Sequence, residues 1–309
     1  MYKLKVLIFG SRGLVGSSLC RVLSNNENIN EIISATREDA DLLNLTETKK
    51  LIQELKPDVV INAAAKVGGV LANNLLRSEF LIENIKININ ILESIIPFSE
   101  IKVINLGSSC IYPLNAQNPI KEESIMSGKL EPTNSPYAMA KLTAIELGDS
   151  ISKQFGHQII NLMPTNLYGP NDNYSDKNSH VIPGLIQRFH KAKIDGLGSV
   201  EVWGSGDPKR EFLYVDDLAD CILYLLKNDI VDTLLNVGSG YEVSIKQLVS
   251  RIVELTNYKG EVVYNHSLPD GNPKKMIDSS KINNLGWSSS TSLDEGLRNT
   301  YSWYVNNIS

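Results

Sequence analysis

Tyr137 and Lys141 are the two side chains whose spacing is best suited to chemistry. They form a Y-x-x-x-K within "SPYAMAKLTAIEL", and residues four apart share one face of a helix. A lysine ammonium near a phenol stabilises the phenolate, which brings the tyrosine pKa closer to the working range of an acid–base catalyst. Because such pairs also arise by chance on helices, the pattern gains weight only beside a cofactor loop and a third polar group.

The segment "LGSSCIYP" (106–113) places a serine pair and Cys110 at the end of an apolar run. The chain has only three cysteines, which are far apart and form no C-x-x-C. That pattern argues against a disulfide framework and against a zinc site. Cys110 is therefore either a packed thiol or a reactive one. We expect Cys20 and Cys221, which lie on helical patterns, in the core.

Apolar runs alternate with helical patterns through the first 170 residues. The runs are nearly continuously apolar, as parallel strands covered on both faces would be. The alternation predicts an α/β protein with a doubly wound parallel sheet of the Rossmann type. The expected strands cover 3–10, 31–36, 58–65, 101–109 and 159–166, and the expected helices cover 14–25, 46–55, 74–96 and 136–155.

A G-x-x-G-x-x-G follows the first expected strand and opens the first expected helix. Glycines allow a tight turn and the close approach of a pyrophosphate, and the helix N-terminus supplies N–H donors. An ordinary strand-to-helix turn is the alternative, but the context favours a dinucleotide site. Its expected residues are Gly10, Ser11, Arg12, Gly13, Leu14, Val15 and Gly16.

The expected dinucleotide is NADP(H). An NAD site usually has Asp or Glu at the end of the second strand. In "SATRED" Arg37 occupies that end, and the acids Glu38 and Asp39 follow one or two places later. Arg12 and Arg37 near a 2′-phosphate would form charge-assisted bonds. The alternative is that both arginines are simply solvated.

The pattern changes after Gly169, where a polar loop leads into a smaller unit. The later patterns predict helices at 181–192 and 215–226 and strands at 199–206 and 234–240. We expect an NADP-binding Rossmann domain and a smaller α+β C-terminal substrate-binding lobe. The domain would comprise 1–170 with 211–240 returning to it, and the lobe 171–210 and 241–309.

Composition excludes several classes of partner. The 309 residues are 42% hydrophobic and 21% charged, with a net charge of −5. No Lys/Arg-rich run occurs, so no nucleic-acid partner is expected. No apolar stretch is long enough to span a membrane, and "KLKVLIFG" after Met1 does not have the pattern of a signal peptide. We expect a cytoplasmic protein with reduced thiols.

Longer motifs resemble one family, the extended short-chain dehydrogenase/reductases, and within it the GDP-L-fucose synthases. The resemblance runs from residue 3 to about 305. It implies NADPH-dependent conversion of GDP-4-keto-6-deoxy-D-mannose to GDP-L-fucose, by epimerisation at C3 and C5 and reduction of the C4 keto group, without a metal. The motifs are "GSRGLVGS", "NAAAKVGGVLANN", "LGSSCIYP", "LEPTNSPYAMAK", "MPTNLYGPNDN", "NSHVIP", "WGSGDPKREFLYVDD" and "LPDGNPKKMID".

The resemblance also implies roles for single residues. Ser108 and Tyr137 contact the sugar C4 oxygen, Tyr137 donates a proton as hydride arrives, and Lys141 binds the nicotinamide ribose and tunes Tyr137. Cys110 is the expected base and His180 the expected acid of epimerisation, which needs two groups that titrate near neutrality on opposite faces of the sugar. The remaining cofactor contacts would come from Leu106, Gly107, Ser108, Ser109, Lys141, Pro164, Thr165, Asn166, Leu167 and His180.

On the substrate side, the resemblance places Arg188 and Arg210 at the diphosphate. Asp270 would contact the GDP ribose or base, and Trp203 would pack in the same cleft. The alternative is that Trp203 belongs to the core and Arg188 is an exposed helix residue. No chemistry is assigned to the expected helix caps Asp216 and Asp217 or to the expected solvated lysines Lys274 and Lys275.

The apolar helix pattern at 75–96 has more than one apolar face and needs cover on more than one side. The resemblance implies that it pairs with the Tyr–Lys helix across a dimer axis. We therefore expect a homodimer with a four-helix interface.

Other functions stay open at this stage. One is an epimerase/reductase or simple 4-keto reductase acting on another GDP-linked keto-deoxy sugar, such as a dideoxy sugar or a heptose. A dehydratase is disfavoured, because that class has Asp-Glu where this chain has Ser109-Cys110. A 4-epimerase is disfavoured because that class retains NAD and usually has an acidic residue at the end of the second strand, where this chain has Arg37. The fold alone would also allow a non-catalytic NADP-binding scaffold, against which the Ser108, Tyr137 and Lys141 set argues.

Overall fold

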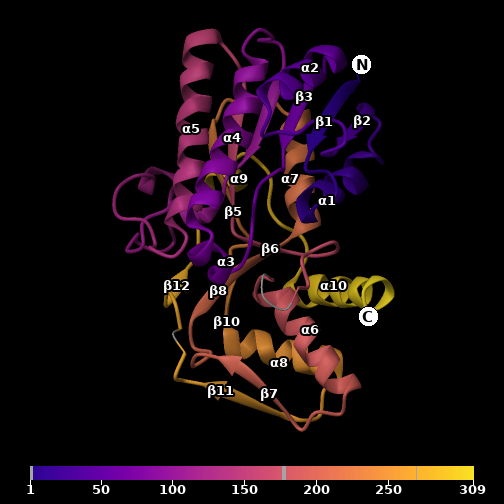
Figure 1. The fold of residues 1–309 in the computed structure, drawn as a ribbon, viewed down its shortest axis with the longest axis vertical. Helices are drawn as coiled ribbons and strands as arrows, with labels where there is room; N and C mark the ends of the chain where they lie inside the picture. The colour runs from indigo at the N-terminus through magenta and orange to yellow at the C-terminus, as the bar shows by residue number, and fades with distance from the viewer. Residues whose placement is uncertain (1–2, 176–178, 269) are drawn as a thin grey trace.

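A six-stranded parallel sheet forms the centre of the larger part of the protein (Figure 1). The computed structural model describes residues 3–175, 179–268 and 270–309. The strand order is β2-β1-β3-β4-β5-β9, and each neighbouring pair is parallel, which confirms the predicted fold class. The strands are β1 (Leu4–Phe9), β2 (Ile29–Ala35), β3 (Val59–Asn62), β4 (Lys102–Leu106), β5 (Ile159–Pro164) and β9 (Leu234–Val237).

The chain reverses its course across the sheet between β1 and β3. From β1 it moves to β2 at one edge and then returns to the other side of β1 to form β3. In doubly wound sheets, ligands bind in the crevice beyond the carboxyl ends of the strands at such a point. The glycine loop directly follows β1, so it lies where this rule expects a dinucleotide.

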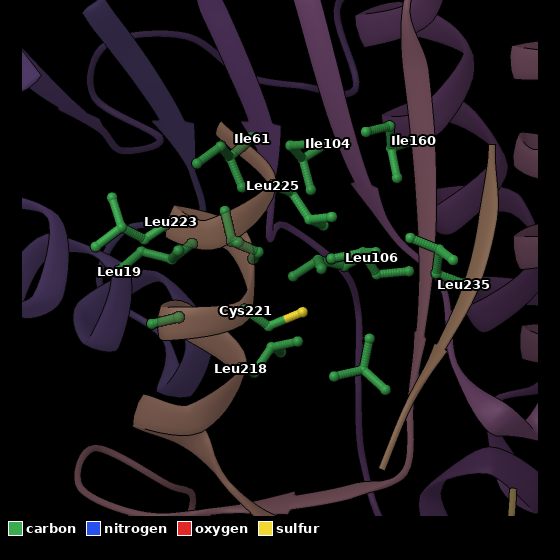
Figure 2. Packing of buried hydrophobic residues seen from close by; sticks show 14 of the residues in the cluster. Leu19, Ile61, Ile104, Leu106, Ile160, Leu218, Cys221, Leu223, Leu225 and Leu235 are labelled. Carbon is green, nitrogen blue, oxygen red and sulfur yellow. The ribbon is translucent and has the colours of Figure 1, made fainter. Parts of the chain in front are cut away.

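Successive residues of the strands face opposite helical layers. Val6 packs with α1 and α7, whereas Leu7 packs with α2, α4 and α5. Figure 2 shows Leu218 and Cys221 of α7 among the leucine and isoleucine side chains of the sheet. Cys221 is therefore a core residue, as expected. The helices are α1 (Leu14–Leu23), α2 (Leu45–Leu55), α4 (Arg77–Ile95), α5 (Ser135–Phe155) and α7 (Val215–Lys227).

A smaller unit lies below the carboxyl ends of the large sheet in Figure 1. Its central strand, β8, pairs with β6, β10 and β12, and β7 pairs with β11. Helices α6, α8 and α10 cover these strands around a second core. The strands are β6 (Asn166–Tyr168), β7 (Ser199–Trp203), β8 (Lys209–Tyr214), β10 (Glu242–Ser244), β11 (Glu261–Asn265) and β12 (Lys274–Lys275). The helices are α6 (Val181–Ile194), α8 (Ile245–Thr256) and α10 (Leu293–Asn307).

The expected elements are observed, but several have other bounds; the strand expected at 101–109, for example, ends at Leu106. The strand expected at 58–65 ends at Asn62. The helix expected at 74–96 is broken at Leu76, where α3 (Val70–Leu75) gives way to α4. Residues 166–168 form β6 and pair with β8 rather than with the large sheet. The exact division into domain and lobe stays a prediction.

Asp216 and Asp217 do not cap α7, contrary to expectation. Asp216 accepts hydrogen bonds from Ser18 and Arg21 of α1, both at 2.5 Å. Asp217 accepts bonds from the backbone and side chain of Thr291, at 3.2 and 2.9 Å. Both carboxylates therefore join α7 to segments that are distant in sequence. Both carboxylates also lie in the first turn of α7, where their negative charge interacts favourably with the positive end of the helix dipole.

All three cysteines are free thiols. Cys20 is only partly buried and packs at the margin of the first core, with its sulfur 3.1 Å from the hydroxyl of Ser34. In the described ranges, no helix combines the length and apolarity that a membrane crossing requires.

Buried asparagines form a ladder across three central strands. Nδ2 of Asn62 donates to Oδ1 of Asn105 at 3.1 Å, and Nδ2 of Asn105 donates to Oδ1 of Asn161 at 2.9 Å. Asn62 also donates to Asn88 of α4 at 2.9 Å. The four side chains are at most 2% exposed, so each bond replaces solvation that burial removed. The ladder fixes the register of β3, β4 and β5 and ties α4 to them.

Replacement of Asn105 by alanine is expected to lower the free energy of unfolding by about 2–4 kcal/mol, because it leaves a buried amide unpaired and opens a cavity. Asn307→Ala, at an exposed helix end, serves as the control and is expected to cost less than about 0.5 kcal/mol. Urea denaturation of both variants measures the difference. Equal stability of the two would show that the ladder contributes nothing.

Candidate active site

Gly10 and Gly16 shape the turn after β1. Gly10 has φ +77°, and a Cβ there would lie 2.8 Å from backbone atoms of Ala63 and Ala64. A Cβ on Gly16 would lie 2.1 Å from the carbonyl oxygen of Gly10. Both positions therefore need glycine for the fold itself, whatever binds outside the turn.

Gly13 differs from these two glycines. Its backbone is extended (φ −79°, ψ 176°), and a Cβ there would meet only the Gly10 carbonyl, at an ordinary 3.4 Å. The fold does not require glycine at this position, so the open space beside Gly13 is suited to a ligand that approaches the backbone. The adjoining N-terminus of α1 offers unpaired N–H groups at Leu14 and Val15. The loop thus fits a dinucleotide pyrophosphate.

Arg12 of the glycine loop and Arg37 after β2 are both accessible. Arg12 lies 3.6 Å from Glu38, and both side chains are largely exposed. Asp39 folds back to accept bonds from the N–H and hydroxyl of Thr36, at 2.7 and 2.9 Å. These bonds hold the pKa of Asp39 below its usual value. Since this acid is engaged with Thr36 and Arg37 is exposed, the segment is compatible with a 2′-phosphate.

Ser11 links the glycine loop to β2, because its hydroxyl donates to the carbonyl of Ala35 at 3.0 Å. The other expected cofactor residues lie after β4 and β5, at the same carboxyl edge of the sheet as the loop. Gly107 is bonded to the Leu162 carbonyl at 2.8 Å, and a Cβ there would collide with Met163. The structure places at this edge Leu106, Gly107, Ser108, Ser109, Pro164, Thr165, Asn166 and Leu167.

A single 3-10 turn, η1 (Ser109–Ile111), carries the serine and the thiol. Ser108 precedes it in an extended conformation, and its hydroxyl accepts from the Cys110 N–H at 3.3 Å. Cys110 is 8% exposed and packs at the inner side of this turn. Since β4 ends at Leu106, both functional groups project from the end of a central strand.

Tyr137 and Lys141 lie one turn apart on α5, as their spacing predicted. Lys141 is 2% exposed, donates to the Leu106 carbonyl at 2.7 Å and lies 5.7 Å from the centroid of the Tyr137 ring. Burial lowers the pKa of Lys141 to about 8. Burial, together with the nearby Cys110, raises the pKa of Tyr137. Tyr137 therefore rests as the phenol, which is the form that a proton donor needs.

Cys110 belongs to the same electrostatic cluster. Burial raises the pKa of its thiol, and the charges of Lys275 and Lys141 and the hydroxyl of Ser108 oppose that effect. The largest influence is desolvation, so the free protein holds Cys110 as a neutral thiol. The structure thus brings together Ser108, Cys110, Tyr137 and Lys141, as the sequence predicted.

Lys275 is not solvated, which corrects the expectation for this residue. It is half-buried on β12, where it pairs in register with Arg210 of β8. Burial lowers its pKa, and the neighbouring Cys110 acts in the opposite direction. Lys274, its neighbour, is exposed. Lys275 therefore places an ammonium group of the smaller unit near the thiol of Cys110, at the edge of the large sheet.

The substrate-side arginines are held by neutral carbonyl groups. Arg210 donates to Lys209 and Asn272 at 2.8 and 2.6 Å, and Arg188 donates to Gly184 and Glu201, both at 3.2 Å. Within the described ranges neither guanidinium forms a salt bridge with a carboxylate. Their positive charge is thus available to an anion such as a diphosphate.

Asp270 and Trp203 lie around the turn that follows β7. Asp270 accepts from the N–H and hydroxyl of Ser205, at 2.6 and 2.8 Å. Trp203 ends β7 and is 64% exposed, so it is not a core residue. An exposed indole at the end of a strand is available to stack on a planar base.

His180 lies on the smaller unit, directly before α6, and its side chain is 47% exposed. Its Nδ1 is 3.9 Å from Oδ1 of Asp172. The structure thus gives His180 an acidic neighbour that the sequence did not single out. In the described residues, no cluster of three His, Cys, Asp or Glu side chains is placed to hold a metal ion.

Sequence reasoning missed two residues of the site. The signal for Lys275 was its place in "LPDGNPKKMID", a motif already singled out. The signal for Asp172 was its place in "MPTNLYGPNDN", eight residues before His180. Both were charged residues in polar segments, where solvation is the default expectation.

A dinucleotide-type sheet with a Ser–Tyr–Lys set beside the end of β4 defines the short-chain dehydrogenase/reductase class. Within that class, the chain belongs to the NAD dependent epimerase/dehydratase family, whose model matches residues 6–238.

Three known proteins are similar over nearly the whole chain. "Probable GDP-L-fucose synthase 1" of Oryza sativa subsp. japonica is 44% identical over 305 residues, which are 98% of this chain and 93% of that protein. A GDP-L-fucose synthetase from Naegleria fowleri, solved with NADP bound, has a TM-score of 0.92 at 29% identity and covers 98% of this chain and 92% of its own. A GDP-6-OMe-4-keto-L-xylo-heptose reductase from C. jejuni has a TM-score of 0.91 at 31% identity, with 98% of each chain covered. The resemblance that the motifs indicated is confirmed.

Proposed function

We propose that the protein converts GDP-4-keto-6-deoxy-D-mannose to GDP-L-fucose with NADPH. The observation that carries this proposal is one electrostatic cluster that holds the thiol of Cys110 together with Tyr137 and Lys141. A simple reductase needs the Tyr–Lys pair but has no use for a thiol beside it. The similarity to GDP-L-fucose synthases supports the same reaction.

Epimerisation uses the acidity that the C4 keto group gives to C3 and C5. Cys110, once ionised, removes a proton from the sugar carbon, and the negative charge moves to the C4 oxygen as an enolate. Hydrogen bonds from Ser108 and Tyr137 to that oxygen stabilise the charge. His180 returns a proton to the opposite face of the same carbon. The cycle is used twice, once at C3 and once at C5.

Reduction uses the same oxygen contacts. NADPH supplies a hydride to C4 when it is bound in the glycine loop. Tyr137, held as the phenol by burial, donates its proton to the C4 oxygen as the negative charge develops there. The ammonium of Lys141 stabilises the resulting phenolate, and Ser108 keeps the oxygen oriented.

The smaller unit is suited to the nucleotide part of the substrate. Arg210 and Lys275 face the same side of adjacent strands because they are paired in register. Together with Arg188, they offer three cations to a diphosphate. Asp270 and Trp203 then offer an acceptor and an aromatic surface to the guanosine.

The test is turnover in deuterated water. The protein is incubated with GDP-4-keto-6-deoxymannose and NADPH, and the product is analysed by NMR for stereochemistry and deuterium content. GDP-L-fucose that carries deuterium at C3 and C5 is the expected result. Oxidation of NADPH without ring deuterium would contradict the epimerase half, and absence of turnover would contradict the assigned sugar.

A second candidate is reduction of another GDP-linked keto sugar, with or without epimerisation. The high structural similarity to a GDP-heptose reductase favours it. The same NMR assay with a GDP-4-keto-heptose distinguishes the two, because the preferred substrate has the higher kcat/KM.

Arg12 of the glycine loop and Arg37 after β2 provide a test of cofactor choice. The double variant Arg12→Ala/Arg37→Ala is expected to raise the KM for NADPH by roughly 10- to 100-fold, because contacts with the 2′-phosphate are lost. The KM for NADH is expected to change less than about threefold, since NADH lacks that phosphate. Arg298→Ala, an exposed arginine of α10, is the control. Equal changes for both cofactors would remove these arginines from 2′-phosphate binding.

We also propose a homodimer built on α4 and α5, which lie side by side (Figure 1). Ile82 of α4 and Met139 of α5 are 51% and 48% exposed, although their helices pack on the sheet. The variant Ile82→Glu/Met139→Glu is expected to run as a monomer in size-exclusion chromatography with light scattering, because charges oppose apolar burial. The unaltered protein is expected at twice the mass of one chain. A monomeric unaltered protein would overturn the proposal.

A reducing compartment suits this chemistry, because Cys110 must stay a free thiol to act as a base. We therefore propose a cytoplasmic location. The protein fused to a fluorescent reporter and viewed in its own cells tests it directly.

A further inference from the structure

Asp172 is a buried carboxylate to which the proposed reaction gives no role. It lies between β6 and α6, and its side chain is only 4% exposed. Oδ1 accepts from the backbone N–H of Asn173 at 2.7 Å. Oδ2 is buried without a hydrogen-bond partner among the residues that the structure describes. An unpaired buried carboxylate oxygen is costly, so a group that uses this charge is expected nearby.

His180 is the cation-forming group within reach. Its Nδ1 lies 3.9 Å from Oδ1 of Asp172, which is within ion-pair distance but too long for a hydrogen bond. Contacts of this kind are often long before substrate binds. Because Nδ1 is directed at Asp172, the other ring nitrogen, Nε2, is the one left for a substrate.

The surroundings of Asp172 are aromatic. Tyr174 is 5% exposed, and its ring stacks on Trp303 and packs against Tyr304 of α10. Burial and then the negative charge of Asp172 raise the pKa of Tyr174. The carboxylate thus lies among poorly solvated aromatic side chains, whereas the imidazole of His180 beside it is 47% exposed.

We propose that Asp172 is a positioning residue that orients His180 for proton transfer. The inference rests on the proposed role of His180 as the acid of epimerisation. The imidazolium gives its Nε2 proton to the enolate carbon, and a C–H bond forms as the Nε2–H bond breaks. The neutral imidazole keeps its Nδ1 proton, donated to Asp172, and solvent restores the proton on Nε2.

A double-mutant cycle with Asp172→Asn and His180→Gln tests the coupling. The assay is deuterium incorporation into GDP-4-keto-6-deoxymannose with NADP⁺ in deuterated water, so that exchange proceeds without reduction. His180→Gln is expected to slow exchange by about 10²-fold or more at the carbon that it serves. Asp172→Asn is expected to slow the same exchange by about 10- to 100-fold, and the double variant should be no slower than His180→Gln.

Two readouts separate positioning from a structural role. Asp172→Asn should change kcat for exchange and leave the KM for the GDP-sugar and the affinity for NADPH within about twofold. Asp149→Asn, which removes a partly exposed carboxylate of α5 that is paired with Lys153, is the matched control and should be unaffected. If Asp172→Asn does not fold, the same cycle is run with Asp172→Glu, which keeps the charge but moves it by one methylene.

The outcomes are distinct. Multiplicative losses in the double variant, or full exchange in Asp172→Asn, would overturn the role of Asp172 while the proposed function stands. Full exchange in His180→Gln would overturn both the acid and its positioning residue. Absence of exchange in the unaltered protein would overturn the proposed function and this inference with it.

Discussion

Replacement of Cys110 by serine is expected to slow deuterium exchange at C3 and C5 by about 10³-fold. The physical reason is the loss of the base, since a serine hydroxyl does not ionise near neutrality and a positioned base contributes roughly 10²- to 10⁴-fold. Serine matches the thiol closely in size, so the turn η1 should be preserved. The affinity for NADPH is expected to stay within about twofold, because the glycine loop is unchanged. The measurement is exchange by NMR with NADP⁺ present, beside NADPH binding.

Cys20→Ser is the matched control, because Cys20 is partly buried on α1, away from the turn η1. It is expected to exchange at the unaltered rate. If Cys110→Ser also exchanges at that rate, Cys110 is a packing residue and another base must be sought.

The pH dependence gives a further check on the same thiol. Because burial raises the pKa of Cys110, the thiolate is the minor form at neutral pH. Below that pKa the thiolate fraction grows about tenfold for each pH unit. In the His180→Gln variant, whose exchange no longer depends on an imidazolium, exchange is therefore expected to accelerate from pH 7 to pH 9. A rate that falls over this range would contradict ionised Cys110 as the base.

Replacement of Tyr137 by phenylalanine is expected to lower NADPH oxidation by about 10³-fold or more, because the proton donor is lost. Exchange at C3 and C5 is expected to fall less, by about 10²-fold, because Ser108 continues to donate to the enolate oxygen. The two rates, measured on one preparation, thus distinguish the role of Tyr137 in reduction from its role in epimerisation. The ring remains, so its edge contact with Phe80 and the fold should be retained.

Tyr241→Phe, at an exposed tyrosine of the smaller unit, is the control and is expected to retain both activities. Equal losses of reduction and exchange in Tyr137→Phe would show that the phenol acts only on the enolate oxygen. Unchanged reduction would remove Tyr137 as the proton donor.

The parts of the fold and site that depend on local pattern were predictable. Apolar runs predicted the five strands of the large sheet that lie in the first 170 residues, and the spacing of Tyr137 and Lys141 predicted their common helix face. These features depend on residues that are close in sequence. The three glycines of the loop were also visible, but the sequence could not tell which two the fold needs. The close contacts of Gly10 and Gly16, and the open space at Gly13, depend on the packed turn.

Features that depend on distant pairing were not predictable. Each rung of the asparagine ladder comes from a separate strand, and a lone asparagine in an apolar run gives no sign of its partners. Lys275 enters the site because a strand of only two residues pairs with β8. The burial of Asp172 likewise depends on contacts that the loop makes only in the folded protein. In each case a solvated polar residue was the reasonable expectation from sequence.

Burial of Cys110 has a consequence for durability as well as for catalysis. Peroxide and alkylating agents attack the thiolate far faster than the thiol, and they must also reach the sulfur. A sulfur that is 8% exposed and rests in its neutral form meets neither condition. The resting protein is therefore expected to keep the thiol of Cys110 intact through a burst of oxidant that would inactivate enzymes with exposed, ionised cysteines.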